Sequence, residues 1–440
     1  MKNARLFVLA LLAAFGSASL ALANGLNLNS LGSRALSMGG AFVGLADDYS
    51  AIYWNPAGMA QFDKRYLGFY ATDVIPSGKY LLQVPAPGGL LTVVDAKTET
   101  KHYLSGLLAY YQPINESLVA GIGLYVPSGL GSSWDGNDFS NLSNGTAYQW
   151  ESKVGLVTIS PGVSYRISEM ISVGATLNIN YGMFSIKRWA GNAEIPQPPY
   201  EFDLGQYEMS LKGWGFGATA GVLVKANDML TFGATIRTPS RVKFSGDASL
   251  SNISLLGFNG SSEAETLSPH VTFPLWIAGG VAFRPMPGLI LTGDLQWTQW
   301  SKLDQIELKF IDPYWSLFMT ASGENVMHLE WEDALQVRFG AEYMFRENLA
   351  FRAGYYYDPS PATDKTMNFL LPNYTFNTFT AGLGYSLNGL VIDLGFEFLI
   401  GKGREVTFAK WMYDPAFANA QPGVYDMSIV VPNISVSYKF

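Results

Sequence analysis

The chain has no cysteine among its 440 residues, which excludes disulfide bridges, thiolate metal sites and thiol nucleophiles. Charge is also scarce, since 15% of the residues are charged whereas 48% are hydrophobic. The net charge of -8 argues against nucleic acid as a partner, because nucleic-acid binding needs clustered lysine and arginine. A large chain of this composition must be held together by backbone hydrogen bonds and side-chain packing.

Long hydrophobic runs are missing from almost the whole chain. Beyond the N-terminal region no stretch of about 18 apolar residues occurs, so the sequence offers no transmembrane helix there. At the N-terminus, basic residues precede a short apolar stretch, and an A-x-A motif ends at Ala23. This pattern predicts a signal peptide over residues 1–23 and therefore export. The alternative is a retained helical anchor, for which the apolar stretch is short.

In place of long runs, the chain has apolar residues that alternate with polar or small ones. In residues 390–400 the even positions are all apolar, and the odd positions include aspartate, glycine and glutamate. The same period of two runs through 171–182, 335–345 and 434–440. Runs of about 10 residues suit tilted membrane strands better than the ~5–6 residues of ordinary strands. Because the polar faces carry glycine, serine, threonine and asparagine, we expect them to face a lumen and the apolar faces to face lipid.

Short turn signals recur along the chain, and they alternate with longer polar loops. The turns are centred near residues 115, 169, 227, 286, 347 and 388. Short turns at one end and long loops at the other are typical of the periplasmic and extracellular ends of outer-membrane barrels. The sequence therefore predicts an all-β fold, a 14-stranded antiparallel transmembrane barrel over residues 63–440 in the bacterial outer membrane. The expected strands lie near 64–75, 99–111, 117–126, 153–167, 171–189, 207–225, 229–246, 269–285, 288–310, 326–346, 347–358, 373–387, 389–405 and 425–440.

Residues 24–62 break the alternation and are rich in glycine and alanine. A barrel of about fourteen strands leaves a lumen unless something fills it. We therefore expect this segment to form a plug, or hatch, inside the barrel. The alternative is a disordered periplasmic tail, which would leave Leu36, Phe42 and Trp54 exposed to water.

The hatch segment contains Asn55-Pro-Ala-Gly58 shortly after an Ala-Asp-Asp stretch. This motif resembles the N-terminal hatch of the FadL/TodX family of outer-membrane transporters. The expected strand number and the C-terminal Tyr-Lys-Phe440 agree with the resemblance, which spans the whole mature chain. The resemblance implies passive uptake of hydrophobic small molecules, most often long-chain fatty acids or, as the alternative, aromatic hydrocarbons.

The resemblance also implies a route. In the family, extracellular loops capture the ligand, which leaves sideways through an opening at a kink in the third strand, beside the hatch motif. Asn55, Pro56 and Ala57 would then form the gate, and the matching strand contains Gly121 and Gly123.

The facing fourth strand carries Pro161 in mid-run. Because proline removes a ladder donor, we expect a bulge or a gap in pairing at Pro161. A barrel corner or bulge without any role in transport is the alternative.

Three arginines are expected on lumen faces from their position in the alternation, namely Arg237, Arg338 and Arg352. The carboxylate of a fatty acid needs such a cation, since an unpaired charge in a dry pocket is costly. The alternative is that the arginines pair with carboxylates of the lumen, such as Glu342.

Several loops expected at the extracellular end are unusually apolar, and they include Leu255, Phe258, Trp315 and Phe318. Exposed apolar patches commonly mark binding surfaces, so these residues are candidates for ligand capture. The loops could instead pack on one another as a cap, and the two interpretations are compatible.

The expected partners are the hydrophobic ligand, the outer-membrane lipids and lipopolysaccharide around the wall, and the barrel-assembly machinery, which would bind the C-terminal strand. Neither a cofactor nor a metal ion is expected, because the histidines lack the spacing of metal ligands. The absence of a G-x-S-x-G motif argues against an enzyme. Other function classes remain open, namely a surface-binding protein such as an adhesin or phage receptor, and an outer-membrane lipase.

Overall fold

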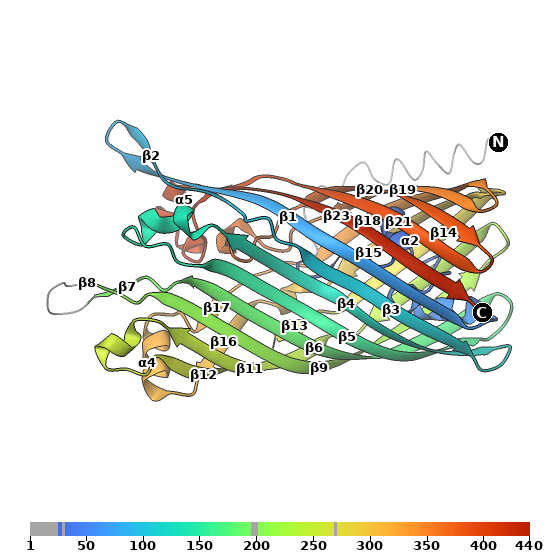
Figure 1. Ribbon diagram of the computed structural model, residues 1–440, viewed down its shortest axis with the longest axis horizontal. Helices are drawn as coiled ribbons and strands as arrows, with labels where there is room; N and C mark the ends of the chain where they lie inside the picture. The colour runs from blue at the N-terminus through green and yellow to red at the C-terminus, as the bar shows by residue number, and fades with distance from the viewer. Residues whose placement is uncertain (1–24, 29–30, 195–200, 268–270) are drawn as a thin grey trace.

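A single antiparallel sheet that closes on itself forms the wall of the protein (Figure 1). The computed structural model describes residues 25–28, 31–194, 201–267 and 271–440, so the expected signal peptide lies outside the described residues. Strand β1 (Tyr66–Ala86) pairs on one side with β3 (Tyr103–Pro113) and on the other with the last strand, β23 (Gly423–Lys439). Closure satisfies the backbone groups that would otherwise form two free sheet edges in lipid. The expected 14-stranded barrel is confirmed.

Several of the fourteen wall segments consist of collinear strands separated by a short break. Pro239 lies between β10 and β11, and Pro274 lies between β13 and β14, as expected for a residue that lacks an N–H donor. The other wall strands are β4 (Leu118–Trp134), β5 (Trp150–Arg166), β6 (Ile171–Trp189), β9 (Gln206–Lys225), β10 (Leu230–Arg237), β11 (Ser240–Leu250), β12 (Ser261–Thr266), β13 (Val271–Phe273), β14 (Trp276–Met286), β15 (Leu289–Thr298), β16 (Gln305–Phe310), β17 (Val326–His328), β18 (Ala334–Arg346), β19 (Leu349–Asp358), β20 (Phe376–Leu387), β21 (Leu390–Gly401) and β22 (Arg404–Val406).

The two ends of the barrel differ as the turn signals predicted. Short turns join the strands at the end where the C-terminus lies (Figure 1). The opposite end carries the long loops, with the strands β2 (Gly89–Lys97), β7 (Asn192–Glu194) and β8 (Glu201–Asp203). It also carries the helical turns η2 (Gly136–Leu142), η3 (Ile253–Leu256), η4 (Trp300–Lys302), α4 (Pro313–Ala321), η5 (Asp364–Thr366), α5 (Phe408–Tyr413) and η6 (Pro415–Phe417). In the described parts of the chain, no helix has the length and hydrophobicity needed to cross a bilayer.

Strand β1 is longer than the sequence predicted, and it forms a protruding hairpin with β2. The sequence predicted an end near residue 75. However, Pro76 pairs with Ile429 of β23 on one side of β1, whereas the pairing with β3 on the other side stops at Val74. The proline is tolerated because β1 has a partner on only one side at that position.

Side chains point outward and inward as the alternation predicted. On β21, Leu394 and Phe396 are 51% and 46% exposed, whereas Asp393 and Glu397 are 2% and 3% exposed. The apolar side chains therefore cover the outer wall, and the polar ones face the lumen.

The N-terminal segment lies inside this lumen as a hatch built from α2 (Ser33–Ser37), α3 (Ala51–Trp54) and η1 (Pro56–Gln61). Leu36, Phe42 and Trp54 are each at most 1% exposed. The alternative of a disordered tail is therefore wrong for the described residues of this segment, because its apolar side chains are buried against the inner wall.

Candidate functional site

The motif expected to form the gate fixes the hatch to the barrel. The buried Asn55 side chain donates to the backbone carbonyl oxygens of Val43, within the hatch, and Val222, on β9, both at 3.0 Å. Its Oδ1 accepts a hydrogen bond from Ala57 N at 3.1 Å, which caps η1. One side chain thus joins two parts of the hatch and the wall.

The motif lies against glycines of β6 and β9 rather than against a kink in the third strand, β4. A Cβ on Gly221 would lie 2.1 Å from Asn55 Oδ1, and a Cβ on Gly174 would lie 2.4 Å from the backbone of Pro56. Any larger residue at these positions would displace the motif. This placement differs from the one that the family resemblance implied.

Gly121 and Gly123 lie in a regular part of the β3–β4 ladder, so the break in the wall is not at these residues. A Cβ on Gly121 would lie 2.8 Å from Met59 Sδ, and a Cβ on Gly123 would lie 3.0 Å from Ile52 Cγ2. The glycines of β4 therefore make room for the hatch.

Pro161 interrupts the pairing of β5 with β6 between the pairs made by Ile159 and Gly162, and the register does not shift. The expected gap in pairing is present, and no bulge accompanies it. On its other side Pro161 still pairs with Ile122 of β4, so the strand order of the wall is intact here.

A break in the wall lies between β3 and β4, closer to the loops. The β3–β4 ladder ends at the pair of Leu107 and Tyr125, and β4 bulges between Tyr125 and Ser128. Closer to the loops, the segment that precedes β3 contacts β4 again, where Glu99 N donates to Ser133 O at 2.8 Å. Between these points β3 and β4 border a window in the wall.

The window requires β4 to continue past Pro127, where the sequence predicted its end. Strand β4 reaches Trp134 because its other edge stays paired with β5 beyond the bulge, from Ser128 onward. Proline cannot donate to a ladder, and bulges are common where pairing ends.

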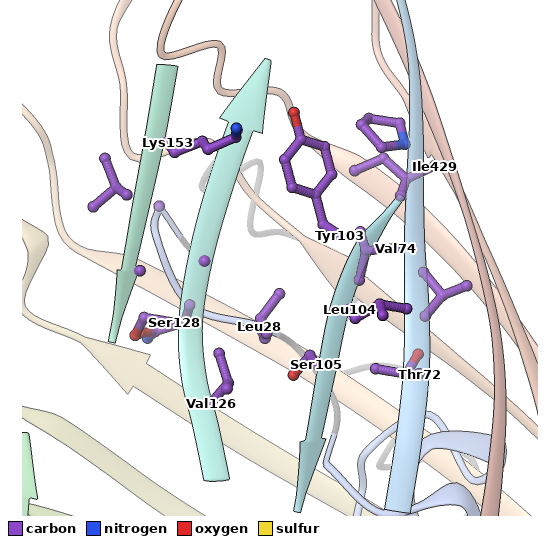
Figure 2. Close-up of a pocket in the computed structure, with 18 of the residues that line it drawn as sticks. Leu28, Thr72, Val74, Tyr103, Leu104, Ser105, Val126, Ser128, Lys153 and Ile429 are labelled. Atoms are coloured by element: carbon purple, nitrogen blue, oxygen red, sulfur yellow. The ribbon is translucent and has the colours of Figure 1, made fainter. Parts of the chain in front are cut away.

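Residues 26–28, hereafter the latch, occupy the free edge of β4 at the window. Leu28 N donates to Pro127 O at 3.0 Å, and Gly129 N donates to Leu26 O at 2.9 Å. Figure 2 shows Leu28 between β3 and β4. The latch thus acts as a very short strand. It forms hydrogen bonds with backbone groups of β4 that are not paired with β3.

A cavity of about 530 Å³ runs from the lumen to the window, within the ~300–1,000 Å³ typical of ligand pockets. Its lining is mostly apolar. At the window it is lined by Leu28, Val74, Leu104 and Val126 (Figure 2), and in the lumen by Phe184, Leu211, Phe376, Leu399 and Met427.

Polar side chains also line this cavity, among them Lys153 and Lys212, and several polar groups lack a partner. The hydroxyls of Tyr103, Ser105 and Tyr374 are buried there without a hydrogen bond to any described residue. Asp358 and Glu397, which face the lumen, also line the cavity. Since buried hydroxyls are normally hydrogen-bonded, these groups are available to a polar group of a ligand or to water.

The three candidate arginines have different surroundings. Arg352 forms ion pairs with Glu342 at 2.6 Å and Asp393 at 2.7 Å, as the alternative interpretation predicted. Arg338 is buried and donates to Gln336 Oε1 and to Gly39 O of the hatch. Both side chains are therefore committed to the structure of the barrel.

Arg237 is the candidate that keeps an available donor. Its guanidinium donates to Tyr53 O at 2.9 Å and lies over the rings of Tyr53 and Trp276, at 4.5 and 4.8 Å from their centroids. Its buried Nε has no hydrogen-bond partner, and among the described residues Arg237 forms no ion pair. A small polar cavity beside it also touches Asn27 of the latch and Ser128.

An ionic network joins the hatch to the wall on the other side of the lumen. Arg34 of the hatch binds Asp47 at 2.5 Å and Glu342 of β18 at 2.7 Å. Glu342 in turn binds Arg352. Because these groups are largely buried, losing one partner would leave an uncompensated charge.

The expected capture residues divide into exposed and anchoring side chains. Leu255 and Phe258 are 76% and 40% exposed. Trp315 is fully buried, and its Nε1 donates to Asn259 O at 2.6 Å, so the expectation that it lies on the surface is wrong. Phe318 is partly buried against the same apolar cluster as Trp315. The loops thus form a cap that also presents an apolar surface.

Sequence reasoning missed the latch, the window residues Leu104 and Val126, and the exposed Leu317 of α4. The alternation Leu26-Asn-Leu28 was a signal for a short strand, but its length is far below that of a membrane strand. The partner of that short strand depends on where the ladder of β3 and β4 ends.

Comparison with known proteins agrees with this architecture. The profile described as "Outer membrane protein transport protein (OMPP1/FadL/TodX)" matches residues 13–440. The chain belongs to the OMPP1/FadL/TodX family. It is therefore an outer-membrane β-barrel of a family of transport channels for hydrophobic compounds, not an enzyme, as the sequence predicted.

Among its relatives in this family is the long-chain fatty acid transport protein of Escherichia coli O6:H1, 25% identical over 415 residues that cover 87% of this chain and 88% of the relative. Outer membrane protein P1 of Haemophilus influenzae is 23% identical over 411 residues, 84% of each chain. Among solved structures, a Pseudomonas aeruginosa FadL homologue matches with a TM-score of 0.77 at 18% identity, covering 95% of this chain and 100% of that one. The Pseudomonas putida toluene transporter TodX matches with a TM-score of 0.71 at 18% identity, with the same coverage.

Proposed function

We propose that the protein takes up long-chain fatty acids by passive diffusion and releases them sideways through the window between β3 and β4. The observation that carries this proposal is the apolar cavity, which runs from the lumen to the window. An axial path would have to pass the hatch, whose side chains fill the lumen below the cavity. A lateral exit instead delivers an apolar ligand directly to the lipid side of the wall.

The latch is the proposed moving part of the gate. Few backbone hydrogen bonds hold it against β4, and its position in the window blocks the passage that the cavity leads to. Asn55, Pro56 and Ala57 are the proposed anchor from which the latch can move, since the hatch stays fixed to β9 through Asn55. Gly121 and Gly123 let the hatch approach the lower border of the window, and Pro161 leaves β5 less tightly paired beside it.

The proposed contact for the carboxylate of the ligand is Arg237. The support is its unpartnered Nε next to the small polar cavity behind the latch. Arg338 and Arg352 have a structural role in this scheme. The fatty acid transport proteins among the relatives agree with an acidic ligand.

Ligand capture is proposed to occur on the cap, where Leu255 and Phe258 expose apolar surface. Phe258 also contacts Tyr314, and their ring centroids lie 5.5 Å apart. Trp315 and Phe318 anchor α4 beneath this surface.

A neutral aromatic hydrocarbon is the second candidate ligand. The observation in its favour is that Asp358 and Glu397, which face the lumen beside the cavity, are carboxylates that would repel an acid. The solved structures that resemble this fold include toluene transporters of Pseudomonas putida and Ralstonia pickettii.

Uptake of labelled oleate and of labelled toluene, in cells with and without the gene, separates these functions. We expect oleate uptake to depend on the gene. A gene-dependent uptake of toluene alone would assign the neutral ligand instead. If neither flux changes, the transport proposal fails and a surface-binding role such as an adhesin takes its place.

A further inference from the structure

A cluster of basic side chains lies on the lipid-facing side of the wall, and one of its members, Lys212, also lines the cavity. Lys212 of β9, Ser245 of β11, Glu265 of β12 and Lys309 of β16 form one cross-strand row, because each pairs with the next in the sheet. Inward-facing residues of the same strands, such as Leu211, are buried, so the residues of this row point outward. Directly opposed residues of neighbouring strands lie about 5 Å apart, so the row is compact.

Two more cations extend the cluster along β11. Lys243 pairs with Trp214 of β9, and Arg241 is the next outward-facing residue, about 7 Å further along the strand. We call Lys212, Arg241, Lys243 and Lys309 the basic patch.

Two of the four cations of the basic patch have no ion-pair partner among the described residues. Glu265 binds Lys243 at 2.9 Å and Lys309 at 3.9 Å, so one carboxylate serves two lysines. Lys212 and Arg241 form no ion pair with any described residue.

The position of the basic patch along the membrane normal is set by its neighbours. Trp214 of β9, which pairs with Lys243, and Phe216, the next outward residue toward the periplasm, are 56% and 63% exposed and continue the apolar wall. On the extracellular side, the next outward row on β11 and β12 contains the acidic pair of Asp247 and Glu263. Exposed aromatic residues mark the edge of the hydrocarbon layer in such barrels. The basic patch therefore lies at the level of the head groups of the outer leaflet.

We propose that the basic patch is a binding site for the phosphate groups of a glycolipid of the outer leaflet. Phosphate is the anionic group found at that level, and lysine and arginine bind it through charge-assisted hydrogen bonds. The aromatic residues beside the patch, Trp214 and Phe216, contact the first part of the acyl chains. The site holds the barrel at a fixed depth and orientation, and its function does not depend on the ligand that the channel carries.

The test compares three probes on the full-length protein in detergent micelles: lipid A with two phosphates, lipid A without phosphate, and inorganic phosphate. Binding is measured by native mass spectrometry. The patch variant combines Arg241→Gln, Lys243→Gln and Lys309→Gln, none of which lines the cavity. The matched control combines Lys79→Gln, Lys97→Gln and Lys402→Gln, which removes the same charge from exposed positions elsewhere near the same end of the barrel.

We expect the patch variant to bind the phosphorylated lipid at least about tenfold more weakly, with the control unchanged. The wild-type protein should lose a similar factor when the phosphates are removed from the lipid. Equal losses in both variants would contradict a local site, and equal binding of the lipid without phosphate would contradict phosphate recognition. Patch-dependent binding of inorganic phosphate that is as tight as lipid binding would assign a soluble anion instead. Oleate uptake by the patch variant separates this result from a failure of transport, because the three substituted residues do not line the cavity.

Discussion

Arg237 and Arg352 were equivalent in the sequence, since both were placed on the lumen face by their position in the alternation. The structure separates them through their partners. Arg352 is neutralised by Glu342 and Asp393, whereas Arg237 donates to a carbonyl oxygen and lies over two aromatic rings. The difference depends on tertiary contacts between strands that are far apart in sequence, so periodicity alone could not reveal it.

Replacing Arg237 by Gln should lower oleate uptake about tenfold or more, since a hydrogen bond to a charged group contributes about 1.5–3 kcal/mol. Toluene uptake should change little, because toluene has no charge to neutralise. Uptake of both compounds, measured side by side, checks the prediction. Arg237→Lys is the matched control and should retain most of the oleate flux. An equal loss for both compounds would show that Arg237 supports the structure rather than the ligand.

Asp48 of the hatch should make stability depend on pH. Burial raises the pKa of Asp48 from its usual 3.8 to about 6, although Ser50 hydrogen-bonds one of its oxygens. Because the pKa is higher in the folded protein than in the unfolded chain, ionisation destabilises the fold. This cost is absent below about pH 4, grows as pH rises toward 6, and is complete above it, at about 3 kcal/mol.

Asp48→Asn should therefore protect the hatch from hydrogen exchange at pH 8 relative to the wild type, and should have little effect at pH 4. Asp63→Asn, at an exposed site just after the hatch, is the control. If Asp48→Asn increases the protection equally at both pH values, the charge of Asp48 is not the cause of the difference from the wild type.

Among the elements, β4 ends at a residue that local sequence signals do not predict. Pro127 is a strong signal for the end of a strand, and the sequence predicted that end. The strand nevertheless continues because β5 holds its other edge, and the proline instead ends the pairing with β3. The position of the window therefore follows from which edge of β4 keeps its partner, and a single sequence does not contain that information.

Filling the window should block the route. Val126→Trp places a large side chain in the cavity at the window, and uptake of both oleate and toluene should fall, since both share the exit. Ile122→Trp is the matched control, because Ile122 lies on the same strand and is 48% exposed on the lipid face. Its uptake should resemble that of the wild type. Uptake unaffected by Val126→Trp would mean that the ligand leaves elsewhere.

The cap can be tested separately from the exit. Replacing Leu255 and Phe258 by Ser should raise the oleate concentration needed for half-maximal uptake several-fold, because each exposed apolar side chain that a ligand covers contributes about 1 kcal/mol. The maximal rate should remain, since the window is unchanged. A fall in maximal rate with no change in half-saturation would contradict the capture role.

At the scale of the whole molecule, the sequence was sufficient to predict the barrel, because the alternating segments and the turns between them are local patterns. The apolar residues of the N-terminal segment, such as Phe42 and Trp54, were sufficient to predict a plug in the lumen. The route was not predictable in the same way. Leu28, Leu104 and Val126 meet at the window only after β1, β3 and β4 are in register.

The central claim is that ligand leaves through a window closed by the latch. A reversible cross-link tests it most directly, because the chain has no cysteine of its own. Asn27 and Ser128 form an isolated β-bridge, and Ser128 Oγ donates to Asn27 Oδ1 at 3.1 Å, so Asn27→Cys with Ser128→Cys can form a disulfide across the latch. Ser172→Cys with Leu223→Cys, an opposed pair of β6 and β9, is the control.

Oleate uptake is then measured with the cysteines oxidised and again after reduction. The account predicts that oxidation of the latch pair abolishes most of the uptake, that reduction restores it, and that the control pair has no such effect. Uptake that is the same in the oxidised and reduced latch variant would contradict lateral release through this window.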